Sequence, residues 1–250
     1  MAAAPAFQPF RPEEFRLYES RNRSDDTLNA KRLAVRQKLQ AIGEATKNAL
    51  AKRGIGCERR ESLHHPFSVN HMRVVAQWTS IFRDAKARKE FTKYVGPDLA
   101  RDADPGNANI AFFVSIDEAS LQFGLRIGAE AWFDSQNFVN KYSRNDALRR
   151  ELADIFKKAP GFQMRMHDWE KLYPSEKASR EDFEELFKYF RVGEHRWTCA
   201  RSIPKDDPRA VAPDLCDTTA AALASLSDIY KAIAWSPENN YLTNAAGGFR

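Results

Sequence analysis

Two stretches of alternating apolar residues, separated by a short polar turn, constrain the fold of this chain more than any other feature. The alternating positions are Ile110, Phe112, Val114, Ile116, Leu121, Phe123, Leu125 and Ile127. Successive side chains of a β-strand point to opposite faces, so this period of two predicts two antiparallel strands with one apolar face. The polar residues 117–120 between the runs supply the turn. The sequence therefore predicts a β-hairpin over Ile110 to Ile127.

The rest of the chain shows helical periods and two more alternating runs. Apolar residues that recur with the helical period of 3.6 residues predict helices over about 26–53, 69–94 and 135–158. The same period predicts a last helix from Asp214 to about 236. Ser179 and Asp182 form a capping-box pattern that opens a short helix. Residues 162–166 and 197–203 alternate as strands do. These elements predict an α+β fold: a single domain with a mainly antiparallel sheet of about four strands and helices packed on one face.

The expected organisation has three parts. Residues 1–25 form an N-terminal arm, in which prolines discourage helix and phenylalanines offer anchors. Residues 26–238 form the single α+β domain, since no repeat or composition shift marks a linker. Residues 239–250 form a polar C-terminal tail.

The sequence lacks the motifs of several functional classes. Neither G-x-x-x-x-G-K-[ST] nor G-x-G-x-x-G is present, so we expect no nucleotide loop of either kind and no cofactor. No apolar run approaches the roughly 18 to 20 residues that a membrane helix needs, and no signal peptide is evident. The three cysteines contain no C-x-x-C pair. A sparse, odd number of cysteines favours a reducing compartment, and we expect the cytoplasm.

The charge of the chain is unevenly distributed. The formal net charge is +5, but residues 1–100 carry +8 and residues 101–250 carry −3. A basic region favours anionic partners such as nucleic acid, phosphorylated ligands or an acidic protein. The alternative is a solvated surface that only keeps the protein soluble.

Strand parity gathers arginines on the polar face of the predicted sheet. On that face lie Gln122, Arg126, Gln163, Arg165, His167, Arg196, Thr198 and Ser202. The planar guanidinium suits phosphate or carboxylate recognition, which makes Arg126, Arg165, His167 and Arg196 a candidate anion-binding site. Phe113 is the one aromatic residue predicted there, fewer than RNA-binding sheets use for stacking. The alternative is a solvated face whose arginines pair with neighbouring carboxylates.

A second basic feature lies on the helix predicted over residues 69–94. Arg83, Lys86 and Lys89 would follow one edge of that helix and offer a contact to nucleic acid. The alternative is again a solvated helix face.

The histidines near the start of the same helix carry a weaker pattern. His64, His65 and His71 are residues of a type that commonly binds metal, but no Asp or Cys lies close enough in sequence to complete a tetrahedral site. We therefore expect no metal site.

The sequence leaves three functions open. The first is a binding protein for an anionic partner, nucleic acid or a phosphorylated ligand, using the basic N-terminal helices and the arginines of the sheet. The second is an assembly or accessory subunit that docks on a protein partner through its aromatic N-terminal arm. The third is a metal-independent enzyme with His167 or His195 as the acid or base and Asp134, Asp168 or Glu194 orienting it.

Overall fold

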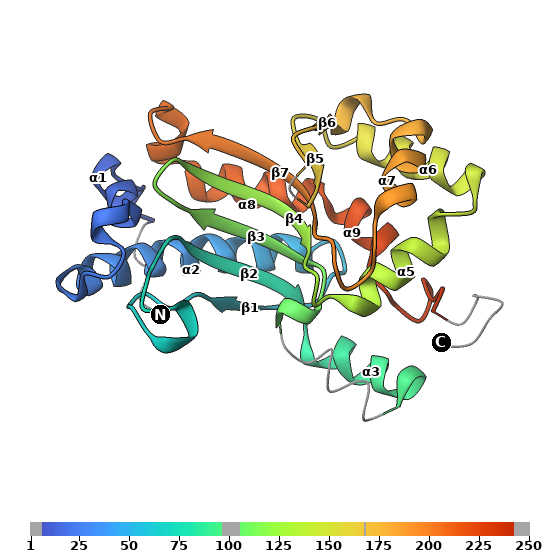
Figure 1. Ribbon diagram of the computed structural model, residues 1–250, viewed down its shortest axis with the longest axis horizontal. Coiled ribbons are helices and arrows are strands. Elements are labelled where there is room, and N and C mark those ends of the chain that lie inside the picture. Colours follow the sequence, from blue (N-terminus) through green and yellow to red (C-terminus); the bar gives the residue numbers. More distant parts are fainter. Residues whose placement is uncertain (1–6, 97–105, 168, 243–250) are drawn as a thin grey trace.

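The computed structural model describes residues 7–96, 106–167 and 169–242. Its centre is one antiparallel sheet of seven strands in the order β1-β2-β3-β4-β7-β5-β6 (Figure 1). The strands are β1 Cys57–Glu61, β2 Gln77–Arg83, β3 Ala111–Ile116, β4 Ser120–Ile127, β5 Gln163–Met166, β6 Tyr173–Pro174 and β7 Trp197–Pro204. The α+β class is confirmed, but the sheet is larger than the predicted four strands.

The helices frame this sheet. They are α1 Pro12–Phe15, α2 Asn29–Ala51, α3 Ala85–Val95, α5 Trp132–Tyr142, α6 Asp146–Lys157, α7 Arg180–Tyr189, α8 Leu215–Ser225 and α9 Ser227–Ile233. Short 3-10 turns connect several of them. No helix among the described residues is both long enough and apolar enough to cross a membrane.

The predicted hairpin is confirmed. Strands β3 and β4 pair antiparallel, with Phe112 opposite Leu125 and Val114 opposite Phe123. All the apolar positions of both runs are buried. The carboxylate of Asp117 accepts hydrogen bonds from the backbone N–H groups of Ala119 and Ser120, at 2.8 Å each, and so holds the turn. The alternation of the strands and the chemistry of the turn both favour a hairpin here, so the sequence alone was sufficient to predict it.

The helix predicted over residues 69–94 is wrong in its first half. Residues 77–83 form β2, a central strand paired with β1 on one side and β3 on the other. Trp78 and Phe82 fit a helical stripe, but they also alternate with Thr79 and Ile81, and both patterns occur in the same segment. Backbone hydrogen bonds to the two neighbouring strands make this segment a strand, and such tertiary contacts often override local propensity. Of the predicted helix, the α-helical part is α3, which begins at Ala85, and a short 3-10 turn covers Ser68–Asn70.

Two other predicted helices are each divided in the structure. The helix expected over 135–158 is two helices, α5 and α6, because Asn145 caps a new start by accepting a hydrogen bond from Leu148 N. The last helix is divided at Leu226 into α8 and α9. The short helix opened by Ser179 is confirmed as α7.

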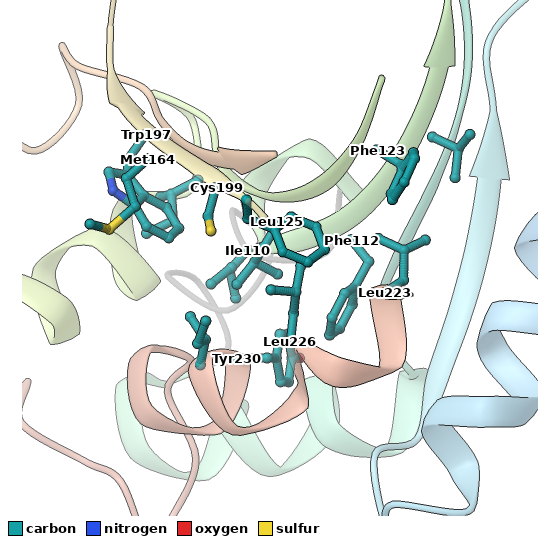
Figure 2. Close-up of a cluster of buried hydrophobic side chains, with 14 of the residues drawn as sticks. Ile110, Phe112, Phe123, Leu125, Met164, Trp197, Cys199, Leu223, Leu226 and Tyr230 are labelled. Atoms are coloured by element: carbon teal, nitrogen blue, oxygen red, sulfur yellow. The ribbon is translucent and has the colours of Figure 1, made fainter. Parts of the chain in front are cut away.

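The two faces of the sheet differ in their neighbours. Helix α2 packs on β1, β2 and β3, and α8 packs on α2 and β4. Both helices lie behind the strands in Figure 1. The hairpin and β7 side chains on this face meet α8 and α9 in the core, where Phe112 stacks on Tyr230 at 5.1 Å between ring centroids (Figure 2). Farther along the sheet, Trp197 contacts Phe138 of α5 and Phe156 of α6.

The chain ends also pack on this body where they are described. Phe10 and Phe15 of the N-terminal segment are buried. The guanidinium of Arg32, itself fully buried, donates hydrogen bonds to the backbone oxygens of Asn22 and Asp25 and so holds the segment on α2. At the other end Leu242 is buried. Residues 1–6 of the predicted arm, residues 97–105 and residues 243–250 of the predicted tail lie outside the described part of the chain.

Candidate functional site

The face of the sheet opposite α2 and α8 is the candidate site, and we call it the open face. In Figure 1 it faces the viewer, and the described helices leave the middle of β2, β3, β4 and β7 uncovered on this side. The side chains that define it are Arg60, Trp78, Ser80, Phe113, Gln122, Arg126, Gln163, Arg165, Thr198 and Ser202, continued by Arg196 and His167 at the ends of β7 and β5. One end is closed, because Phe82 is buried beneath Gly106.

The register places the predicted arginines in neighbouring rows. Residues directly opposite one another in paired strands share a face. Arg126 of β4 is opposite Thr198 of β7, and Thr198 is opposite Arg165 of β5. Just beyond these strands, His167 N donates a 2.6 Å hydrogen bond to Arg196 O, so His167 and Arg196 also lie beside each other. The register thus places Arg126 and Arg165 on one face, as strand parity predicts, while Arg196 and His167 lie one residue beyond the strands, His167 with a left-handed backbone.

Arg126 lies in the same cross-strand row as Phe82, near the closed end of the open face, and its side chain reaches toward Trp78 and Phe113. Its guanidinium carbon lies 5.4 Å from the ring centroid of Trp78 and 5.3 Å from that of Phe113, and Nη2 donates a 2.9 Å hydrogen bond to Ser80 Oγ. Burial lowers the pKa of Arg126, and so does the positive charge of Arg196, while Glu130 acts in the opposite direction. An arginine keeps its charge despite such shifts. This cation is therefore oriented by two rings and a hydroxyl rather than by a bonded carboxylate.

Within the described ranges, the arginines of the open face are not paired with carboxylates. Among the described residues, Arg60, Arg126, Arg165 and Arg196 form no ion pair. Arg60, Arg165 and Arg196 are exposed. Arg59, one position from Arg60 but on the opposite face, pairs with Glu61 and Glu44. Arg59 is therefore neutralised on the helix side of β1, whereas its neighbour Arg60 on the open face is left for solvent or an anion.

The basic helix edge predicted from Arg83, Lys86 and Lys89 does not form. Arg83 ends strand β2, is buried, and pairs with Asp134 of α5. Lys86 and Lys89 are exposed on α3. The edge is absent because a strand replaces the first half of the predicted helix. Arg83 ends that strand, whereas Lys86 and Lys89 belong to α3, which begins after its N-cap Asp84.

Two of the three histidines of the β1–β2 loop, His64 and His65, lie next to each other. The ring centroids of His64 and His65 are 4.9 Å apart in an edge-to-face arrangement. His71 has a left-handed backbone, with φ of 53°. Within the described ranges, no group of three or more His, Cys, Asp or Glu side chains is arranged to hold a metal ion.

The two histidines proposed as acid or base lie together at the end of the open face. The ring centroids of His167 and His195 are 5.4 Å apart. Nδ1 of His195 accepts a 3.0 Å hydrogen bond from Arg191 N. Asp134 does not orient either ring, because its carboxylate pairs with Arg83 and accepts from Ile110 N and Trp235 N. Asp168 lies outside the described residues.

Sequence reasoning missed three residues of this face. Trp78 and Ser80 fall in the helix predicted over residues 69–94 and Arg60 falls in no predicted element, although β2 places Trp78 opposite Ser115 and β1 places Arg60 opposite Ser80. The alternation of Gln77, Thr79 and Ile81 with Trp78 and Ser80 was the available signal. The open face therefore carries a second aromatic ring beside Phe113.

Comparisons with known proteins supply no identity for this site. Neither the models of known protein families nor the curated protein sequences include a match to this chain. The function of the open face therefore has to be inferred from its own geometry and charge.

Proposed function

We propose that this protein binds nucleic acid on the open face, with the arginines contacting phosphate oxygens. The observation that carries the proposal is the set of four arginines, Arg60, Arg126, Arg165 and Arg196, on one helix-free face without ion pairs among the described residues. Most protein contacts to nucleic acid go to the phosphate and sugar, and arginine is the residue best suited to them. The free cysteines agree with the cytoplasm as the proposed compartment.

The width of the charged face favours a polymer over a small phosphorylated ligand. Arg60 lies on β1 and Arg165 on β5, five strand positions apart in the sheet order. With about 4.8 Å between neighbouring strands, their backbones are separated by roughly 24 Å. A single phosphate group cannot contact both positions, but a chain of phosphates can.

The aromatic rings favour a single strand as the form that binds. Trp78 is half-buried, and with the buried Phe113 it flanks the Arg126 guanidinium, so Trp78 and the guanidinium are the surfaces that a base can reach. Planar cations and aromatic rings both offer stacking surfaces for unpaired bases. The middle of the face thus supplies stacking, and the arginines around it supply phosphate contacts.

Fluorescence anisotropy with a labelled single-stranded 20-mer tests this function. We expect Arg165→Glu to reduce affinity at least tenfold at low salt, and the plot of log affinity against log salt to become shallower by about 0.7 per lost phosphate contact. Arg144→Glu is the matched control, because Arg144 is exposed in the turn between α5 and α6, away from the open face. Absence of binding by the unmodified protein at low salt, or equal losses in both variants, would contradict the proposal.

A different surface favours the second candidate, an assembly role. The loop between β1 and β2 exposes four large apolar side chains: Phe67, Val69, Met72 and Val75. Contiguous exposed apolar residues often mark protein interfaces. The N-terminal arm itself is a poor docking element, because Phe10 and Phe15 are buried in this chain.

Sedimentation velocity over a hundredfold concentration range tests this alternative. Self-association that is lost in the double variant Phe67→Ser, Val69→Ser would support it. A constant monomer mass would remove self-assembly through the loop.

A further inference from the structure

A pocket of about 740 Å³ lies on the helix-covered side of the sheet, between the end of β7 and helix α8. Its lining includes Arg201, Arg209, Thr218, Thr219, Phe123 and Leu215. Arg201 is opposite Phe123 in the β4–β7 register, so both side chains point away from the open face. The two arginines of the pocket thus lie away from Arg126 and Arg165, although Gln163 and Ser202 of the open face also belong to its lining.

The pocket exists because β7 is longer than its neighbour. Strand β5 begins at Gln163, opposite Ala200, and β7 continues from Arg201 to Pro204 without that partner. The Arg201 guanidinium then turns onto the Phe162 ring, with its carbon 4.4 Å from the ring centroid, and Nη2 donates a 2.5 Å hydrogen bond to Pro160 O. A Cβ on Gly161 would stand 3.0 Å from Nη2, so the glycine leaves room for this arrangement.

Two polar atoms of the pocket residues are buried without a hydrogen-bond partner among the described residues. They are Arg201 Nε and Thr219 Oγ1. Thr219 is only 1% exposed. Buried polar groups of folded proteins are nearly always hydrogen-bonded, and each exception asks for an explanation. Arg201 also forms no ion pair within the described part of the chain.

A second cation stands near the first. Burial and the positive charge of Arg209 both lower the pKa of Arg201. Arg209 is held by Asp207, through a 2.6 Å contact between Nη2 and Oδ2, and its side chain is 74% exposed. The first turn of α8 borders the same space, and helix N-termini favour negative charge. Asp214 is the one carboxylate in the lining that opposes an anion.

We propose that this pocket binds a small phosphorylated molecule. Arg201 and Arg209 hold the phosphate, Thr219 Oγ1 donates to one of its oxygens, and Phe123 with Leu215 contacts the apolar part of the molecule. A phosphate monoester fits better than a carboxylate because it offers three terminal oxygens to donors that come from different elements, β7, the turn before α8 and α8 itself. Such a ligand would give both unpartnered atoms a hydrogen-bond acceptor and would pair the charge of Arg201, whereas Arg209 already has Asp207 as a partner.

Isothermal titration calorimetry with phenyl phosphate tests the proposal, with phenol as the uncharged comparison. We expect binding of phenyl phosphate but not of phenol. Arg201→Gln and Arg209→Gln should each weaken it at least tenfold, and the exposed position of Arg209 makes its variant safe for folding. Asp214→Asn should strengthen binding severalfold, because it removes the opposing charge.

Thr219→Val separates a ligand contact from a structural role. Valine has nearly the same shape and lacks the hydroxyl, so the thermal midpoint should stay equal or rise, whereas the affinity for phenyl phosphate should fall about threefold to tenfold. Arg165→Gln on the open face is the matched control and should leave this binding unchanged. The proposal is overturned if phenyl phosphate fails to bind at low ionic strength, or if Arg201→Gln and Arg209→Gln bind it as tightly as the original protein. Either result leaves the nucleic-acid proposal intact, because that one depends on Arg165.

Discussion

Gly124 shows how a single residue shapes the open face. A Cβ at this position would stand 2.1 Å from Cys199 O and 2.6 Å from Ala200 Cα, both on the neighbouring strand β7. Only glycine allows β4 and β7 to approach this closely. The result is a flat floor of Gly124 and Ala200 between Phe113 and Gln163.

We expect Gly124→Ala to destabilise the protein by about 1 to 3 kcal/mol, because the clash is with backbone that has little room to move. Urea unfolding followed by circular dichroism measures the change. Gln122→Ala on the same strand and face is the control and should cost much less. An alanine variant as stable as the original protein would show that the strands can separate at little cost.

The cysteines give a second prediction at this scale. Burial, with the negative charge of Asp84, raises the pKa of Cys57 to about 12, and burial also raises the pKa of Cys199 and Cys216. The thiolate is the reactive form, and a higher pKa leaves less of it at a given pH. At pH 8 a disulfide reagent such as dithionitrobenzoate should label the native protein much more slowly than free cysteine, and should label three thiols after unfolding. Rapid labelling of native protein would contradict these environments.

At the scale of the element, caps decide where helices begin. Ser179 Oγ accepts a hydrogen bond from Asp182 N at 3.2 Å, and Asp182 Oδ2 accepts one from Ser179 N at 2.9 Å. This reciprocal pair starts α7, whose Phe183, Leu186 and Phe187 are buried. The cap thereby positions an apolar face against the end of the sheet.

Replacing Ser179 by alanine should lower the free energy of unfolding by about 1 kcal/mol, the usual cost of losing an N-cap. Thermal or chemical denaturation gives the value. Ser225→Ala provides the comparison, because that hydroxyl donates to Ala222 O near the end of α8 and caps no helix start. Equal, negligible effects in both variants would mean that tertiary packing alone fixes α7.

At the scale of the whole molecule, one buried ion pair joins segments that are distant in sequence. Asp134 of α5 pairs with Arg83 of β2 and accepts hydrogen bonds of 2.8 Å from both Ile110 N and Trp235 N. Arg83 Nη1 in turn donates to Trp235 O. Four parts of the chain therefore meet at one carboxylate.

Asp134→Asn should destabilise the protein by about 3 to 5 kcal/mol, because it leaves the Arg83 charge buried without its partner. The midpoint and slope of a urea transition measure this. Glu58→Gln removes the carboxylate from a partly exposed pair with Arg88 and should change stability by less than about 1 kcal/mol. A similar small effect at Asp134 would show that water reaches the pair.

The sequence by itself determined the features that depend on neighbouring residues. Alternation specified the hairpin and the faces of β5 and β7, and so identified Arg126, Arg165 and Arg196 as residues of one face. The Ser179 cap is likewise local. In these segments the apolar period fits one secondary structure only.

The remaining features depend on contacts between residues that are distant in the sequence. The segment around Trp78 fits both a helix and a strand, and the ladders to β1 and β3 made it a strand. That choice placed Trp78 beside Arg126 and buried Arg83 against Asp134. The order of the strands, which leaves the end of β7 beside Arg201 without a partner on its β5 side, also comes from contacts between distant residues. Local patterns cannot specify such contacts, because their free energy appears only when both partners are in place.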